Sequence, residues 1–193
     1  DVTDASAGTD NILLAIDAGV SPVVGTTGFS PRDLEEIDTR SRVAGVGAFI
    51  APNFALGAVM LMQMCETAGP FFDHIEIIEL HHDKKIDAPS GTALHTAQGI
   101  IDARGKDAAK VPTDTFTLEG VRGGDYKGIK LHSVRLPGLV AHQEVMFGAL
   151  GQTLTIRHDS TSRDSFMPGV ILAVRRVRAL EGIVIGLDKL LFD

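Results

Sequence analysis

The sequence is poor in cysteine, in positive charge and in long apolar runs, and each shortage excludes a class of protein. Cys65 is the single cysteine in 193 residues, so no intrachain disulfide can form. The chain has 18 Lys and Arg but 25 Asp and Glu, and the resulting net charge of −7 argues against a surface that binds nucleic acid or an anionic membrane. No apolar run reaches membrane-spanning length, and no signal-peptide pattern opens the chain. These absences predict a protein of the reducing cytoplasm.

Apolar residues make up 44% of the chain, enough to build the core of one large domain or two small ones. The first part alternates helix-like and strand-like segments. We predict helices over residues 7–19 and 30–42, a short buried strand over residues 21–25, and a second short buried strand within 46–54 that leads into a loop. The second helix has Ser, Pro and acidic residues at its start, as helix N-termini prefer. This alternation is typical of a doubly wound parallel sheet.

The later part of the chain has a different pattern, which predicts an α+β domain. Residues 55–69 are apolar nearly all round and predict a buried helix that contains Cys65 as a small buried hydrophobe. We expect the following elements in chain order: a strand over 74–80, a helix capped by Ser90, a loop over 105–127, strands within 128–137, 139–150 and 152–160, and a helix over 166–178. Turn signals between the three late strands predict an antiparallel meander. The last helix is free to pack back on the first part.

Two loops in the first part have the composition of a ligand site. "VVGTTGFS" places Gly25, Thr26 and Thr27 at the carboxyl end of a predicted parallel strand, where open α/β sheets bind ligands. "APNF", residues 51–54, follows the next strand at the same sheet edge. A glycine-rich turn and a helix cap at Asn53 are the structural alternatives for the two loops. Their position at neighbouring strand ends favours a shared ligand.

The densest group of functional side chains lies in "IEIIELHHDKKIDAPSGTA", residues 75–93. His81 and His82 end the strand, Lys84 and Lys85 follow, and the helix start after Ser90 offers free backbone N–H groups to an anion. Imidazole, ammonium and an anion-binding helix start together predict acid–base chemistry on an acidic small molecule. The structural alternative is a solvated loop before an ordinary capped helix.

Other chemistries fit this stretch less well. There is no His-Glu-x-x-His spacing, and the lysines would repel a cation near the histidine pair, so we predict no metal site. Ser90 does not lie in a Gly-x-Ser-x-Gly elbow, which argues against a hydrolase nucleophile. Arg135 is either a second anion contact or part of an ion pair. The remaining histidines are scattered, and we interpret each as structural or surface: His74, His95, His132, His142 and His158.

"ELHHDKKIDAPSGTA" resembles the signature of the 4-hydroxy-tetrahydrodipicolinate reductase family, also called dihydrodipicolinate reductase. "VVGTTGFS" and "APNF" are similar to the two nicotinamide-side loops of that family, in the right order, and "DVT" is similar to the strand end before them. The resemblance also includes "LVAHQEVMFG" and "IGLDKLL" and covers essentially the whole chain. The motif around His81 is highly specific, whereas "GTTG" alone is not.

The resemblance implies a role for each matching position. His81 would be the catalytic acid/base and Lys85 the proton-donating lysine. The implied substrate contacts are His82, Ser90, Gly91 and Thr92. The implied contacts to NADH or NADPH are Gly25, Thr26, Thr27, Ala51, Pro52, Asn53 and Phe54.

The resemblance also implies an architecture and a reaction. Residues 1–54 would be the C-terminal part of a Rossmann dinucleotide domain, residues 55–163 the substrate and tetramerisation domain, and residues 164–193 a segment returning to the first domain. The fold class is then α/β plus α+β, with a partial Rossmann-like parallel sheet and a mixed or antiparallel second sheet. The enzyme would be a homotetramer that reduces a cyclic dicarboxylate in lysine and diaminopimelate biosynthesis.

The chain departs from the family pattern in two places. A Gly-x-x-Gly-x-x-Gly phosphate loop is expected near the start of the family and does not occur here, so we expect that the given chain lacks the N-terminal part of a longer protein. The residues that decide between NADH and NADPH are missing with it. "RLPGLVAHQ" also stands where many members have an Arg-Gly-Gly run. The alternatives are a non-catalytic ligand-binding fragment and a metal-dependent lyase that uses the histidine pair.

Overall fold

The computed structural model describes residues 1–2, 5–113 and 115–192. Contacts divide the chain into two compact units, and the chain crosses between them twice. Unit 1 comprises Asp1–Val59 with Asp164–Asp193, and unit 2 comprises Met60–Arg163.

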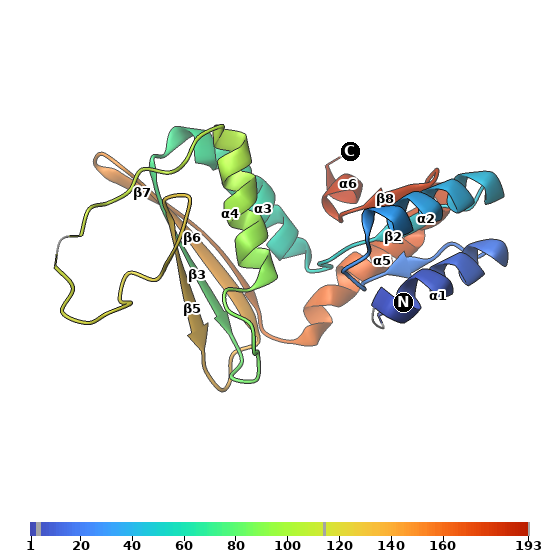
Figure 1. Ribbon diagram of the computed structural model, residues 1–193, viewed down its shortest axis with the longest axis horizontal. Helices are drawn as coiled ribbons and strands as arrows, with labels where there is room; N and C mark the ends of the chain where they lie inside the picture. The colour runs from blue at the N-terminus through green and yellow to red at the C-terminus, as the bar shows by residue number, and fades with distance from the viewer. Residues whose placement is uncertain (3–4, 114, 193) are drawn as a thin grey trace. The chain divides into compact units, whose positions relative to one another are not determined.

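Unit 1 is a parallel three-stranded sheet with helices (Figure 1). Its elements are α1 (Ala5–Asp17), β1 (Val23–Val24), α2 (Pro31–Ala44), β2 (Ala48–Ile50), the start of α3 (Leu56–Ala68), α5 (Met167–Arg176), β8 (Ile183–Ile185) and α6 (Asp188–Leu191). The strand order is β1-β2-β8, and both pairings are parallel. The C-terminal segment therefore joins the sheet of the first part through β8.

Local sequence explains the helices of unit 1. Ser30 caps α2, its hydroxyl accepts from the backbone N–H of Asp33 at 3.2 Å, and the Asp33 carboxylate accepts in return from the N–H of Ser30 at 2.8 Å. Gly45 ends the helix with φ +64°, a conformation that glycine adopts without strain. The apolar sides of α1 and α2 then close over the sheet. Six buried residues form this core: Ile12, Ile16, Val24, Ile37, Ala48 and Ile50.

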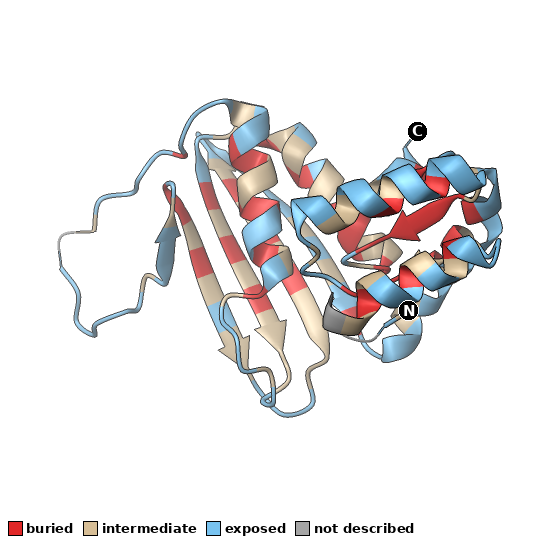
Figure 2. Ribbon diagram, turned by 45° about the vertical axis from the view of Figure 1, so that its right-hand side comes forward, coloured by how far each residue is buried: buried red, intermediate tan, exposed pale blue. Residues whose placement is uncertain are grey.

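Unit 2 is a five-stranded mixed sheet with α3 and α4 packed on one face (Figure 1). Besides α3, its elements are β3 (His74–His81), α4 (Gly91–Arg104), β4 (Gly124–Tyr126), β5 (Ile129–Arg135), β6 (Ala141–Ala149) and β7 (Gln152–Ser160). Burial alternates along the strands, as Figure 2 shows, because every second side chain faces the helices. Short 3-10 turns lie at Gly69–Phe71, Arg163–Phe166 and Val177–Ala179.

The predicted antiparallel meander is wrong in its strand order. The sheet runs β4-β5-β3-β6-β7, so β3 lies between β5 and β6. β3 pairs in parallel with β5 and antiparallel with β6, and among the three late strands only β6 and β7 form a hairpin. Turn residues predict where the chain reverses but not which strands then pair. β3 lies at the centre of the sheet, between β5 and β6.

Cys65 lies in the core of unit 2, as predicted, with 0% of its surface exposed. Burial, with a smaller contribution from nearby Glu66, raises the pKa of this thiol to about 12. Among the described residues, no helix is long and apolar enough to cross a membrane.

Candidate active site

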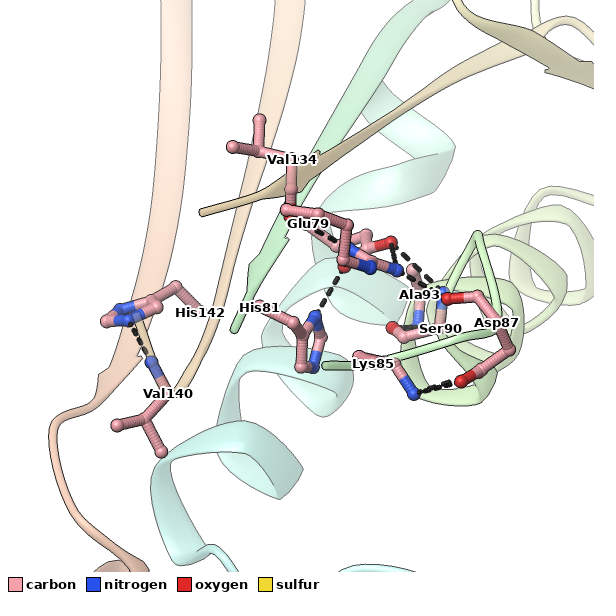
Figure 3. A network of polar contacts seen from close by, with 10 residues as sticks. Glu79, His81, Lys85, Asp87, Ser90, Ala93, Val134, Val140 and His142 are labelled. Atoms are coloured by element: carbon pink, nitrogen blue, oxygen red, sulfur yellow. Dashed lines mark hydrogen bonds and ion pairs between the residues drawn. The ribbon is translucent and has the colours of Figure 1, made fainter. Parts of the chain in front are cut away.

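The candidate site of unit 2 begins with a charged residue on the buried face of a strand. Along β3, Ile75, Ile77 and Glu79 face the helices, and His81 follows on the same face because side chains alternate. Glu79 is completely buried at 0% exposure. Its Oε2 lies 2.5 Å from Nδ1 of His81, whose side chain is 16% exposed. The buried carboxylate of Glu79 thus holds the partly exposed ring of His81 at the end of β3 (Figure 3).

Several further donors compensate the charge of Glu79. Arg135, from β5, forms a bidentate ion pair with Glu79: Nη2 donates to Oε1 at 2.7 Å, and Nη1 donates to Oε2 at 2.9 Å. The backbone N–H of Ser90 donates to Oε1 at 3.2 Å. Burial raises the pKa of Glu79, but hydrogen bonds from His81, Arg135 and Ser133 outweigh it and lower the pKa to about 2. Glu79 is therefore ionised at every physiological pH.

The N-terminus of α4 completes this wall of the site. Ser90 is the N-cap, as predicted, and its hydroxyl accepts from the N–H of Ala93 at 3.2 Å. The next two residues, Gly91 and Thr92, are the first of the helix, where backbone N–H groups have no partner within the helix. Gly91 is exposed, and a side chain added there would meet nothing within 4 Å. The helix start is open to an anion such as a carboxylate.

The loop between β3 and α4 separates the two lysines. Lys85 is 22% exposed, and its Nζ donates to the two carboxylate oxygens of Asp87 at 2.7 and 2.8 Å. Lys84 is exposed. Figure 3 shows Lys85 beside His81, directed toward Asp87, while His81 is directed toward Glu79. A turn in which Lys85 N donates to His82 O at 3.2 Å makes this arrangement possible. His82 is half-buried just beyond the strand.

The two predicted cofactor loops lie together in unit 1, at the carboxyl ends of adjacent parallel strands. The first, Gly25–Thr27, follows β1, and the second, Ala51–Phe54, follows β2. A backbone hydrogen bond from Ala51 N to Val24 O, at 2.9 Å, connects the starts of the two loops. The side-chain oxygen of Asn53 accepts from Ala55 N at 2.9 Å and so stabilises the turn before α3. Asn53 lies three residues before the first residue of α3, so it is not the N-cap of the helix.

The side chains of these two loops are uncharged. Thr27 is exposed at the sheet edge, whereas Thr26 is buried and donates to Asp1 Oδ1 at 3.3 Å. The edge offers a hydroxyl, an exposed Pro52 and backbone amides but no cationic side chain within the two loops, which fits a neutral carboxamide and ribose. Of the Asp-x-Thr segment before them, Thr3 lies outside the described residues.

Sequence interpretation missed Glu79 and left Arg135 undecided. The signal for Glu79 was present: it continues the buried-face series of β3, and a charged residue on such a face requires partners. Arg135 forms the ion pair rather than a free anion contact. Of the scattered histidines, His132 pairs with Glu76 at 2.9 Å and His142 with Asp159 at 2.7 Å, so both have structural partners. Within the described ranges, no cluster of three or more His, Cys, Asp or Glu could hold a metal ion.

Two family models match the chain. The model for "Dihydrodipicolinate reductase, N-terminus" matches residues 1–54, and that for "Dihydrodipicolinate reductase, C-terminus" matches residues 57–191. The chain belongs to the dihydrodipicolinate reductase family. A 4-hydroxy-tetrahydrodipicolinate reductase of Geobacillus kaustophilus is 54% identical over 99% of this chain and 72% of its own length. The enzyme of the same name from Halalkalibacterium halodurans is 50% identical with the same coverage.

A solved dihydrodipicolinate reductase has the same fold. The structure titled "Dipicolinate bound Dihydrodipicolinate reductase from Paenisporosarcina sp. TG-14" is 44% identical, with a TM-score of 0.88 over 98% of this chain and 73% of that one. These matches confirm the predicted dihydrodipicolinate reductase family, the predicted fold class and an NAD(P)H-dependent oxidoreductase. An amine dehydrogenase from Mycobacterium smegmatis, 11% identical with a TM-score of 0.53, is similar in fold alone.

Proposed function

We propose that this chain reduces 4-hydroxy-tetrahydrodipicolinate to tetrahydrodipicolinate with NADH or NADPH, as a step of lysine and diaminopimelate biosynthesis. The observation that carries the proposal is the group at the end of β3: His81 held by Glu79, Lys85 beside it, and the open start of α4. A relative that binds dipicolinate, a cyclic dicarboxylate, supports a substrate of this kind. The relatives named as reductases favour the enzyme over a non-catalytic ligand-binding fragment.

In this mechanism the residues bind, orient and protonate the substrate. The N–H groups of Gly91 and Thr92 hold one substrate carboxylate, with His82 and the Ser90 cap beside them. His81 and Lys85 supply the proton that, with the hydride, reduces the ring, while the 4-hydroxyl group of the substrate leaves as water. The loops Gly25–Thr27 and Ala51–Phe54 would hold the nicotinamide end of the cofactor, which would supply the hydride.

Steady-state kinetics on three variants test these roles. If Lys85 donates a proton in the transition state, Lys85→Met lowers kcat by roughly 10²–10⁴-fold, the usual loss for a general acid. His81→Ala should resemble it. Lys84→Met is the matched control, since it removes the same charge one residue away on an exposed side chain, and it should change little. Equal and mild effects at both lysines would show that they form only a solvated charged loop.

We also propose that unit 2 assembles the chain into a homotetramer. The helices α3 and α4 cover one face of its sheet, and the other face carries half-buried apolar side chains between ion pairs. β7, nine residues long, is an edge of that sheet, and such an edge can pair with another chain. Light scattering at micromolar concentration should give the mass of four chains. A monomeric mass would refute this assembly.

A cytoplasmic location is part of the same proposal. The single cysteine is a free thiol in the core, which suits a reducing compartment. Fractionation of the native host, followed by an assay of reductase activity, would test it. Activity in the membrane or secreted fraction alone would contradict it.

A further inference from the structure

A row of three polar side chains crosses the sheet of unit 2 at the end of its apolar core; Glu79 and Gln143 are buried, and Ser133 is exposed. In the register of the sheet, Glu79 of β3 lies opposite Ser133 of β5 on one side and Gln143 of β6 on the other. Gln143 is 6% exposed and donates from Nε2 to the Thr96 hydroxyl of α4 at 2.8 Å. The residues of the preceding row are apolar. The row is thus a polar interruption directly beneath α4, and Glu79 is its centre.

The hydrogen bonds of Glu79 determine which nitrogen of His81 carries a proton. An ionised carboxylate can only accept hydrogen bonds. Nδ1 of His81, 2.5 Å from Oε2, must therefore be the N–H donor. The other ring nitrogen, Nε2, is then left to exchange a proton with a ligand. In the opposite tautomer, two acceptors would face one another in a buried site, which is strongly unfavourable.

Glu79 also ties His81 to the helix that binds anions. Oε1 accepts from the N–H of Ser90, the cap of α4, while Oε2 accepts from His81. Arg135 donates to both oxygens of Glu79 and also to Asp87 O at 2.6 Å. The Glu79 carboxylate therefore cannot rotate without breaking several hydrogen bonds. One rigid carboxylate sets the direction of the imidazole relative to the first turn of α4.

We propose that Glu79 is a positioning residue of the reductase: it holds His81 as the Nδ1–H tautomer and aims Nε2 at the substrate bound by the start of α4. This inference rests on the function proposed above. A purely structural Glu79, needed only as the partner of Arg135, would make different predictions. Its removal would change stability without any dependence on His81.

A double-mutant cycle on kcat separates the two roles. Glu79→Gln keeps the size of the side chain but removes its charge and replaces one acceptor by a donor. In the otherwise unchanged enzyme we expect kcat to fall roughly 10–100-fold, the range for losing the outer hydrogen-bond partner of a functional histidine. In the His81→Ala background the same change should alter kcat by less than about twofold, because the residue it positions is gone.

The outcomes of the cycle distinguish the inference from the function on which it rests. If His81→Ala is itself silent, the proposed role of His81 fails, and the positioning role with it. If His81→Ala is severe but the loss from Glu79→Gln is the same in both backgrounds, only the positioning role is overturned. Circular dichroism and cofactor affinity identify any variant that does not fold.

Nitrogen-15 NMR of the unaltered enzyme tests the tautomer without any variant. We expect the His81 ring to carry a proton on Nδ1 throughout the pH range in which the protein is folded. A neutral ring protonated on Nε2 would overturn the inference. Arg135→Met provides the control, since it removes the ion pair of Glu79 but leaves the His81 contact. The Nδ1 proton should remain in that variant, and its loss would show that Glu79 does not hold the ring by itself.

Discussion

The hydrogen bonds to the buried carboxylate of Glu79 predict a specific dependence of stability on pH, because together they outweigh the effect of burial on its pKa. Its pKa falls from the ordinary value of 4.5 to about 2 in the folded protein. Because each tenfold change in proton affinity is worth about 1.4 kcal/mol, the ionised carboxylate contributes about 3 kcal/mol to the free energy of unfolding. A depressed pKa means that this contribution is complete above about pH 5 and is lost as the pH falls toward 2. About 2 kcal/mol of it should be gone at pH 3.

Urea denaturation of the parent chain and of Glu79→Gln, at one protein concentration, measures this contribution. Other carboxylates titrate in both proteins and cancel in the difference. The stability difference should be constant from pH 7 to about 5 and then shrink by about 2 kcal/mol by pH 3. Glu119→Gln is the matched control, since that carboxylate is exposed in the same unit, and its difference should stay near zero. A difference for Glu79→Gln that does not change with pH would refute the assignment of Glu79 as a buried, ionised hub.

Three further predictions concern other parts of the chain. Gly25→Val should weaken cofactor binding measured by calorimetry, because a Cβ there would already lie 3.2 Å from Cγ1 of Val2 and 3.4 Å from the Phe54 ring, which leaves the two further methyl groups of valine no room without displacing these neighbours or a ligand; unchanged affinity would refute the role of this turn. Cys65, with its pKa raised to about 12, should react with a disulfide reagent only on unfolding, and rapid reaction of the native protein would contradict its burial. Ser90→Ala should destabilise unit 2 by about 1 kcal/mol through loss of the N-cap of α4, and Ser30→Ala should destabilise unit 1 by about the same amount through loss of the N-cap of α2. Equal melting temperatures for the parent and both variants would argue against the two caps.

Local signals in the sequence were sufficient to place most elements. Ser30 and Ser90 begin helices because a short hydroxyl before a helical pattern satisfies backbone N–H groups, a relation that involves only four residues. The strand after residue 73 was predictable from its alternating apolar residues. The choice of partner strands was not predictable in this way. Pairing depends on contacts such as Glu79 with Ser133, 54 positions apart in the chain, and no turn residue specifies them.

The error in the predicted strand order and the failure to predict Glu79 as a site residue have one physical cause. In a meander, β3 would lie at an edge or in another sheet, and a carboxylate at position 79 would lack a strand on at least one side. The observed order puts Ser133 and Arg135 on one side of β3 and Gln143 on the other. It arises because the connection from β5 to β6 crosses the end of β3, where Leu136 N donates to His81 O at 3.1 Å. That crossing holds the backbone of His81, and Glu79 holds its side chain. The strand order that the turn signals did not predict therefore also builds the site around Glu79.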